Sequence, residues 1–339
     1  MALREVSGAM ILSALAVLPL GAVQAQDGEA PWADCAKLKT VPLPLEDKPS
    51  AATLKAFKGC SSEALYYGIG VAKDPGRARQ CAYVEREGSD NGWPNLFVGT
   101  GILMTIYANG VGADRNFDVA MRFACELEGA PAEEEGWLAH LQKLKKENRQ
   151  GTDFSPCEDI TSGAAMGFCA AHEAKLTGAS RKAKLARITA QWSSGERKAF
   201  ATLEKAKAKY VASEGDNEVD MSGTARAALV IGATEAEEER FLTILQRLIA
   251  GDLPRVSASD LGKTDNELNA LYQKIQKSGD TSGWGTVTKD GIKKTQRAWL
   301  IYRDAFVNFA KVKFSSLAPQ SLQKVLTEDR VKRLEDLGG

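Results

Sequence analysis

Few side chains in this sequence of 339 residues are suited to catalysis. His140 and His172 are the only histidines, which leaves little material for a zinc site or a histidine-dependent triad. The G-x-S-x-G, H-E-x-x-H and phosphate-loop motifs are absent. A G-T-G at Gly99 to Gly101 is expected inside a helix, where glycine allows close helix packing. We therefore predict a protein that is not an enzyme and that uses no cofactor and no metal.

The first 25 residues have the features of an export signal. Arg4 precedes an apolar run, and Val23-Gln24-Ala25 has the small-residue pattern of a cleavage site. No cysteine beside that site offers a lipid anchor, and no basic cluster follows the apolar run to stop its transfer through a membrane. The mature protein is therefore expected to be periplasmic or secreted, without membrane insertion after signal cleavage.

The cysteines are expected to form disulfides, because export would place every thiol in an oxidising compartment. The mature chain holds an even number of cysteines: Cys35, Cys60, Cys81, Cys125, Cys157 and Cys169. We expect three disulfides, since the C-x-x-C spacing of a zinc site is absent. Cys157 with Cys169 would close a small loop, worth about 3 kcal/mol in chain entropy. The connectivity of the other four stays open. One arrangement joins two antiparallel helices through Cys60–Cys81 and leaves Cys35 with Cys125.

The elements that must position these residues begin with a repeat. An extended lead-in at 26–57 carries four prolines, and G-I-G-V-A-K-D-P-G-R-A (68–78) is then echoed 42 residues later by G-V-G-A-D-R-N-F-D-V-A (110–120). Each copy is expected to be a helix, a glycine loop and a second helix, because glycine supplies the positive φ that such a loop needs. Hairpins of this kind stack, since none can bury its apolar side alone. A helix at 131–150 is expected to cap the stack.

This pattern resembles the Sel-one-like repeat, a relative of the tetratricopeptide repeat. The first copy matches the second half of that repeat at Gly68, Gly70, Val71, Asp74, Arg77 and Ala78. The second copy keeps the tyrosine, both glycines and the final alanine, but has Ala113 and Asn116 at the valine and aspartate positions. The resemblance implies a short solenoid at 58–150 whose concave surface binds peptides or protein partners.

The rest of the sequence is helical in period and rich in Lys, Ala and Glu. One helix is expected at 194–212, and another opens with an acidic turn after Thr234 and closes at Gly251. A weak internal similarity suggests a degenerate tandem pair at 156–250 and 255–339. The prediction is an all-α protein, with a short α-hairpin solenoid followed by one or two small helical bundle domains.

The last section is similar to the LprI-type lysozyme-inhibitor-like domain of exported bacterial proteins. Its L-N-x-x-Y, Q-R-x-W-x-x-x-R-D and L-T-x-x-R helices stand here in the same order. The matching residues, which we expect to be mainly structural, are Tyr272, Gln296, Arg297, Trp299, Arg303, Asp304, Thr327 and Arg330. The two-cysteine opening of that family also resembles 157–169, which supports the pair Cys157–Cys169. The family often has a cysteine after the R-D pair, whereas Phe306 occupies that region here.

The helix around this motif carries an aromatic face at spacings of three, four and three: Trp299, Tyr302, Phe306 and Phe309. We expect these rings to be core rather than a ligand-stacking surface, with about 1.5–3 kcal/mol gained by burying each. Arg303 and Asp304 are adjacent and should not face each other on one helix. Arg303 is therefore expected to pair with Glu267 or Glu328. Thr327 is expected to cap a short final helix.

Lys plus Arg (44) equals Asp plus Glu (44), so the net charge does not favour nucleic acid as a partner. Both resemblances favour a protein partner, and the second names a lysozyme-like muramidase. Lysozymes are often cationic, so acidic loops would speed association. The first candidate loop holds Glu214, Asp216, Glu218 and Asp220, and the second is E-A-E-E-E at 235–239. The structural alternatives are a solvated hairpin loop and a helix N-terminal turn.

The sequence therefore suggests a non-enzymatic exported protein that binds another protein, with muramidase inhibition by its C-terminal half. The alternative is a periplasmic scaffold whose repeats organise envelope partners while the C-terminal section acts as a spacer. An enzyme would require a pocket with converging ionisable groups.

Overall fold

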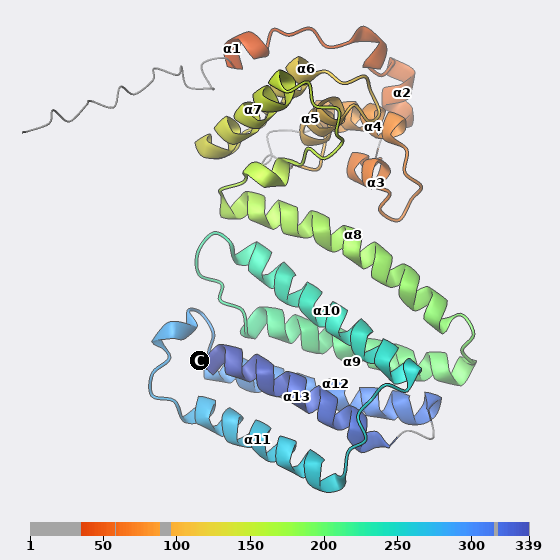
Figure 1. The fold of residues 1–339 in the computed structure, drawn as a ribbon, viewed down its shortest axis with the longest axis vertical. Helices are drawn as coiled ribbons and strands as arrows, with labels where there is room; N and C mark the ends of the chain where they lie inside the picture. The colour runs from red at the N-terminus through yellow and green to blue at the C-terminus, as the bar shows by residue number, and fades with distance from the viewer. Residues whose placement is uncertain (1–34, 58, 89–95, 315–317, 339) are drawn as a thin grey trace, which may run out of the picture.

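The computed structural model describes residues 35–57, 59–88, 96–314 and 318–338. Within these ranges the regular structure is helical, without a strand, which confirms the all-α prediction. A group of helices from α1 to α7 lies on one side of the long α8, and α9 to α13 lie on the other (Figure 1). The export signal predicted at 1–25 lies outside the described residues. None of the described helices combines the length and apolarity needed to span a membrane.

The N-terminal group builds the repeats. Its helices are α1 (Cys35–Leu38), α2 (Ala51–Ala56), α3 (Ser62–Tyr67), α4 (Pro75–Gly88), α5 (Thr100–Asn109), α6 (Phe117–Ala124) and α7 (Pro131–Lys146). The lead-in is less extended than predicted, because α1, α2 and the 3-10 turn η2 (Leu45–Asp47) fall within it. Asp47 fixes this segment on the repeats, as its carboxylate accepts from the Tyr107 hydroxyl (2.8 Å) and pairs with Arg79 (2.6 Å).

The 42-residue repeat of the sequence is also a repeat of structure. Gly68 ends α3 and Gly110 ends α5, both in the left-handed region at φ 80° and 63°. Ala78 and Ala120 are fully buried where the second helix of each hairpin crosses the first. The hydrogen bonds that close the loops are equivalent: Asp74 N–H to Leu65 C=O (2.8 Å) and Asn116 N–H to Tyr107 C=O (3.0 Å). Two equivalent hairpins are therefore present, capped by α7 through the buried Trp137.

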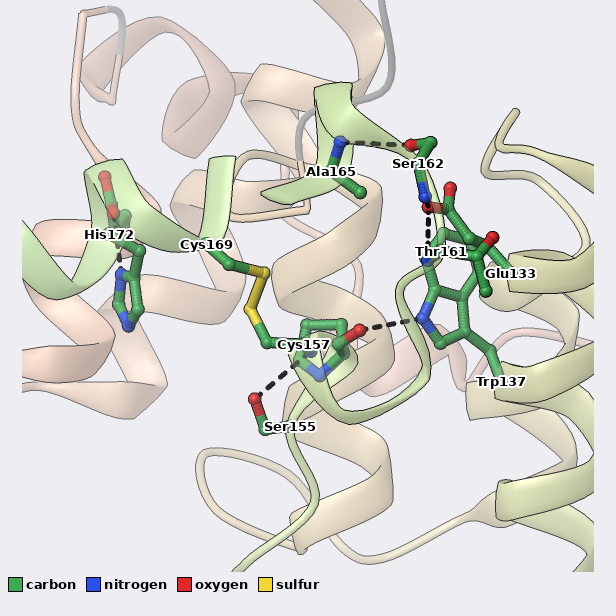
Figure 2. The surroundings of a disulfide bond; sticks show 11 residues. Glu133, Trp137, Ser155, Cys157, Thr161, Ser162, Ala165, Cys169 and His172 are labelled. Atoms are coloured by element: carbon green, nitrogen blue, oxygen red, sulfur yellow. Dashed lines mark hydrogen bonds and ion pairs between the residues drawn. A yellow bond between two sulfur atoms is a disulfide. The ribbon is translucent and has the colours of Figure 1, made fainter. Parts of the chain in front are cut away.

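All six cysteines form disulfides, and all three bonds lie in or beside the N-terminal group: Cys35–Cys125, Cys60–Cys81 and Cys157–Cys169. The third joins the 3-10 turn η3 (Pro156–Asp159) to α8, as Figure 2 shows. Glu85 lies close to the sulfur atoms of Cys60 and Cys81, but those sulfurs are bonded to each other and are not available as metal ligands.

The C-terminal half contains six longer helices: α8 (Gly163–Thr189), α9 (Ser194–Asn217), α10 (Arg226–Ala250), α11 (Ala258–Lys277), α12 (Lys289–Lys313) and α13 (Pro319–Gly338). One hydrophobic core is shared by α9 to α13, so the two predicted tandem stretches pack as one body, the C-terminal bundle. α8 connects the two halves, because Ala165 packs in the core of the repeats and Leu185 packs on the bundle.

Two helix starts differ from the prediction. α10 begins at Arg226 rather than after Thr234, because its first turns lie on small residues of α8, where a Cβ added at Gly167 would be 3.2 Å from Ala227. α13 begins at Pro319, a residue preorganised for the first helical position. Thr327 therefore lies inside a helix and is not a cap.

Candidate functional site: buried charges and an anchored loop

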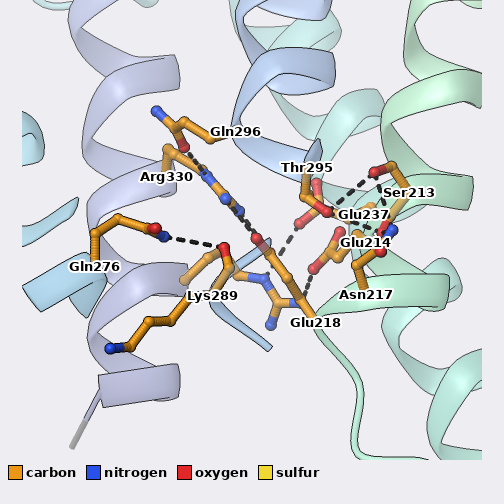
Figure 3. A network of polar contacts seen from close by, with 11 residues as sticks. Ser213, Glu214, Asn217, Glu218, Glu237, Gln276, Lys289, Thr295, Gln296 and Arg330 are labelled. Carbon is orange, nitrogen blue, oxygen red and sulfur yellow. Dashed lines mark hydrogen bonds and ion pairs between the residues drawn. The ribbon is translucent and has the colours of Figure 1, made fainter. Parts of the chain in front are cut away.

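Arg330 of α13 occupies the centre of a polar network inside the C-terminal bundle (Figure 3). The residue as a whole is 1% exposed, and its side chain donates to both carboxylate oxygens of Glu218 at 2.6 and 2.7 Å. Its Nε donates to the Gln296 side-chain oxygen of α12 at 2.8 Å. Burial acts to lower the pKa of Arg330, but its hydrogen bonds to the Glu218 carboxylate and the negative charge of that group outweigh burial and raise the pKa. Such two-point pairs are among the strongest polar contacts in proteins.

A second layer of charges surrounds this pair. Arg333 of α13 pairs with Glu214 of α9, and its Nε lies 3.5 Å from Glu237 of α10. Arg240 pairs with Glu237 as well, and burial raises the pKa of that glutamate. Together with the central pair, three buried carboxylates face three guanidinium groups. A buried carboxylate without a cation costs several kcal/mol, so this balance is a condition of the fold.

The network corrects the predicted acidic loop at 214–220. α9 continues to Asn217, which turns Glu214 and Glu218 toward α13, where they are 1% and 6% exposed. Both carboxylates are committed to arginines and cannot attract a cationic partner. Asp220 is half-buried and bonds to neighbouring loops. Of the four predicted residues, Asp216 alone is exposed.

The second acidic stretch, 235–239, lies in the middle of α10 rather than in its first turn. Glu235 pairs with Arg181 of α8 at 2.7 Å, and Glu238 pairs with Lys207 of α9 at 2.6 Å. These carboxylates therefore join α10 to its neighbours instead of forming a free acidic surface.

The aromatic face of α12 forms core, as predicted. Its rings are between 0% and 4% exposed: Trp299, Tyr302, Phe306 and Phe309. They meet aromatic residues of α9, with the Tyr302 ring stacked on Tyr210 at 5.3 Å between centroids. α12 packs more extensively on α9 than on any other helix, so the helix that carries the motif depends on α9 for its buried surface.

The Arg303 prediction was wrong in its partners. The guanidinium lies over the Trp299 ring (5.2 Å to the centroid) and donates to the adjacent Asp304 at 3.0 Å. Asp265 of α11 lies 4.0 Å from the guanidinium, at the limit of an ion pair. Neither expected glutamate pairs with this arginine. The arginine side chain is long enough to bend back along its own helix and reach the adjacent Asp304. The rule that adjacent helical residues do not face each other neglects this length.

The remaining motif residues divide between surface and core. Arg297 is exposed, and Tyr272 is half-buried against the shared core. Thr327 is fully buried, and its hydroxyl donates to the Gln323 carbonyl one turn earlier at 2.8 Å. Most of the motif therefore lies in or against the core of the bundle, while a mainly structural role for these residues stays a prediction.

One exposed element of the bundle is fixed in position. This element, here termed the anchored loop, comprises residues 278–288 between α11 and α12 and includes the 3-10 turn η4 (Ser282–Trp284). Asp220 accepts from the Thr286 N–H at 3.0 Å and from its hydroxyl at 3.2 Å. Gly285 is required beside it, because an added Cβ would lie 2.1 Å from the Asp220 carboxyl carbon, at a φ of +58°. Hydrogen bonds from Ser222 and Thr286 lower the pKa of Asp220 to about 2.

The tip of the anchored loop is acidic and aromatic. Asp280 is exposed and accepts from the Ser282 N–H at 2.9 Å, and this hydrogen bond lowers its pKa. Trp284 is half-buried, with part of its ring packed on the core. The sequence alone does not reveal the anchor of this loop, because the carboxylate that holds it comes from the distant α9–α10 connection.

A comparison with known protein families finds a similarity in the last section. Residues 251–337, which cover α11, α12 and nearly all of α13, match the family model "Lysozyme inhibitor LprI". This confirms the resemblance predicted for the C-terminal section. No curated protein and no solved structure matches the chain. The likeness of the hairpins to Sel-one-like repeats stays a prediction.

Proposed function

We propose that this protein is exported, binds a protein partner without catalysing a reaction, and inhibits a lysozyme-like muramidase through the anchored loop. The observation that carries the proposal is the family match over 251–337. The three disulfides agree with a compartment outside the cytoplasm, where such bonds persist.

The anchored loop suits insertion into a cleft because it is ordered before binding. Ordering a flexible loop on association costs affinity, and Asp220 removes that cost by fixing Thr286. Trp284 offers an aromatic ring of the kind that dominates binding energy at interfaces. Asp280 offers an ionised acceptor to a cationic enzyme, and the protonated general acid of a muramidase cleft could donate to it.

The test is a muramidase assay with the oxidised mature protein titrated against several lysozyme types. We expect dose-dependent inhibition that weakens as salt increases, because salt screens exposed charges. The variant Asp280→Ala with Trp284→Ala should inhibit at least about tenfold less, since aromatic anchors typically contribute 2 kcal/mol or more. The matched control is Asp216→Asn, an exposed acid of the same bundle outside the loop, which should inhibit like the unaltered protein.

Two outcomes would overturn the proposal. Absence of inhibition at high excess against every lysozyme type would remove the muramidase partner and favour the scaffold alternative, to be pursued by capturing partners with the repeats. Inhibition that survives the loop variant would retain the partner and exclude the anchored loop as the inhibitory element. Circular dichroism of each variant separates a lost contact from a lost fold, because Trp284 also packs on the core.

A further inference from the structure

A pocket of about 440 Å³ lies where the repeats meet α8, far in sequence from the anchored loop. Its wall contains Tyr66 and Tyr67 of α3, Phe154 of the connection before η3, and His172 of α8. The disulfide Cys157–Cys169 closes one side. This volume is in the range of pockets that bind small molecules, and the aromatic wall with a few polar groups is typical of them.

His172 is held in one orientation within that wall. Its Nδ1 lies 2.8 Å from a carboxylate oxygen of Glu63, and the ring as a whole is 8% exposed. Phe97 stacks on the imidazole at 3.8 Å between centroids with an angle of 9° between the planes, and Tyr67 lies edge-on to it at 4.3 Å. Carboxylate, stacked ring and edge-on ring together leave the Nε2 edge as the part that a ligand can reach.

The partner of Nδ1 determines what Nε2 can do. Burial acts to raise the pKa of Glu63, but hydrogen bonds from His172 and Lys175 outweigh it and lower the pKa. Glu63 is therefore an ionised acceptor, and Nδ1 donates to it. When the imidazole carries a single hydrogen, that hydrogen is the one on Nδ1, and the accepting lone pair is on Nε2. Among the described residues Nε2 has no hydrogen-bond partner, and it is not one of the side-chain atoms that are both sealed from solvent and unbonded.

The other polar groups of the pocket complement this acceptor. Burial raises the pKa of both Tyr66 and Tyr67, so their hydroxyls remain neutral and able to donate. Asn109 offers little more, because its amide already bonds the Phe154 N–H (2.9 Å) and C=O (3.0 Å). A ligand would therefore meet one oriented acceptor, tyrosine hydroxyls and an aromatic wall, together with the exposed charged residues Lys73 and Glu173, which also line the pocket.

We propose that this pocket binds a small ring compound that donates an O–H or N–H to Nε2 of His172, a hydroxylated aromatic ring being the simplest case. The inference is independent of muramidase inhibition. A larger cavity of about 610 Å³ lies beside the start of α8. It offers a ligand fewer polar groups, because its buried ones are already hydrogen-bonded (Figure 2). There Glu133 accepts from the Thr161 and Ser162 N–H groups, and Trp137 donates to the Pro156 carbonyl at 2.9 Å.

The experiment compares phenol with toluene, which have similar rings but differ in the donor. Ring ¹⁵N signals of the two histidines are followed by NMR while phenol is titrated to about 50 mM and toluene to its lower limit of solubility in water, since fragments of this size bind in the millimolar range. We expect phenol to shift the His172 Nε2 signal and to bind about three- to tenfold more tightly than toluene, the effect of one hydrogen bond. The His140 signals should not move.

The variant His172→Phe keeps a ring against Phe97 and removes the acceptor. It should bind phenol and toluene equally, whereas the matched control His140→Phe should keep the preference for phenol. The proposal is overturned if phenol leaves the His172 signals unchanged, or if His172→Phe keeps the preference. Should that variant fail to fold, the shift of the His172 signal in the unaltered protein decides the question alone.

Discussion

Replacing Arg330 by methionine would leave Glu218 buried without its cation. The side chains of this pair are 0% and 2% exposed, so solvent screens their interaction little. Breaking one side of a buried ion pair costs about 3–5 kcal/mol. In a bundle of roughly 150 residues, each kcal/mol lowers the melting temperature by about 2–4 °C. Arg330→Met should therefore melt about 6–20 °C below the unaltered protein.

A double variant distinguishes the loss of the attraction within the ion pair from the cost of leaving the Glu218 carboxylate buried and unpaired. Arg330→Met combined with Glu218→Leu removes both charges, and apolar replacement of a buried pair is often neutral or stabilising. We therefore expect the double variant to be more stable than Arg330→Met alone. A control is provided by Lys313, which pairs with Glu196 at 2.9 Å with both side chains at least 20% exposed. Lys313→Met should cost less than about 1 kcal/mol.

The assay is urea unfolding with hydrogen exchange of peptides from α12 and α13, because this measures the bundle separately from the disulfide-bonded repeats. A cost below about 1 kcal/mol for Arg330→Met would refute the argument, since it would mean that Glu218 reaches water or another cation. A double variant less stable than either single variant would refute it as well, because the pair would then contribute more than it costs to bury.

Three further predictions follow from the geometry. Gly112→Ala places a Cβ 2.5 Å from the Pro75 carbonyl oxygen and should lower the stability of the repeats in a thermal melt. The control Gly70→Ala, whose Cβ meets open space, should cost about 1 kcal/mol and therefore less than Gly112→Ala. Equal losses for the two variants would contradict the contact with Pro75. The pKa of Asp220 is about 2 in the folded protein, below its ordinary value of about 3.9. The hydrogen bonds that hold the anchored loop should therefore be intact above pH ~4 and lost as the pH falls through about 2. A midpoint near pH ~4 in a ¹³C titration of the Asp220 carboxyl group would contradict this. A fragment of residues 251–337 should give the NMR spectrum of an unfolded chain while 191–339 folds, because the shorter one lacks Glu218 and the α9 surface; a folded spectrum from the shorter fragment would show that α9 is dispensable.

Features set by local pattern were predictable from the sequence. The spacing of Trp299 and Phe306 determines which face of α12 is buried, whatever helix lies opposite. Likewise, Gly68 and Gly110 recur with equivalent neighbours, so the second hairpin followed from the first. Periodicity of 3.6 residues and positive φ are properties of the chain itself, and tertiary packing did not overrule them here.

The charges were not predictable in the same way. Glu214 and Glu218 were interpreted as loop residues because glutamate is seldom buried, yet both continue the stripe that Leu203 and Tyr210 form on α9. That continuation was a usable signal. Their arginine partners lie more than a hundred residues later, and no local pattern specifies which side chain will meet them. The same holds for Asp220 and its hold on the anchored loop.

The missing cysteine of the C-terminal section explains why α9 is needed. Relatives of the LprI type often carry a cysteine after the R-D pair, and here Phe306 is fully buried in that region, with its ring 5.5 Å from Phe241 of α10. A disulfide typically contributes about 2–4 kcal/mol, and burying one phenylalanine contributes about 1.5–3 kcal/mol. A disulfide and a buried phenylalanine thus stabilise a fold by similar amounts, but an aromatic ring does so only when another surface covers it. In this chain α9 and α10 supply that surface, so the segment that matches the family is one part of a larger folding unit.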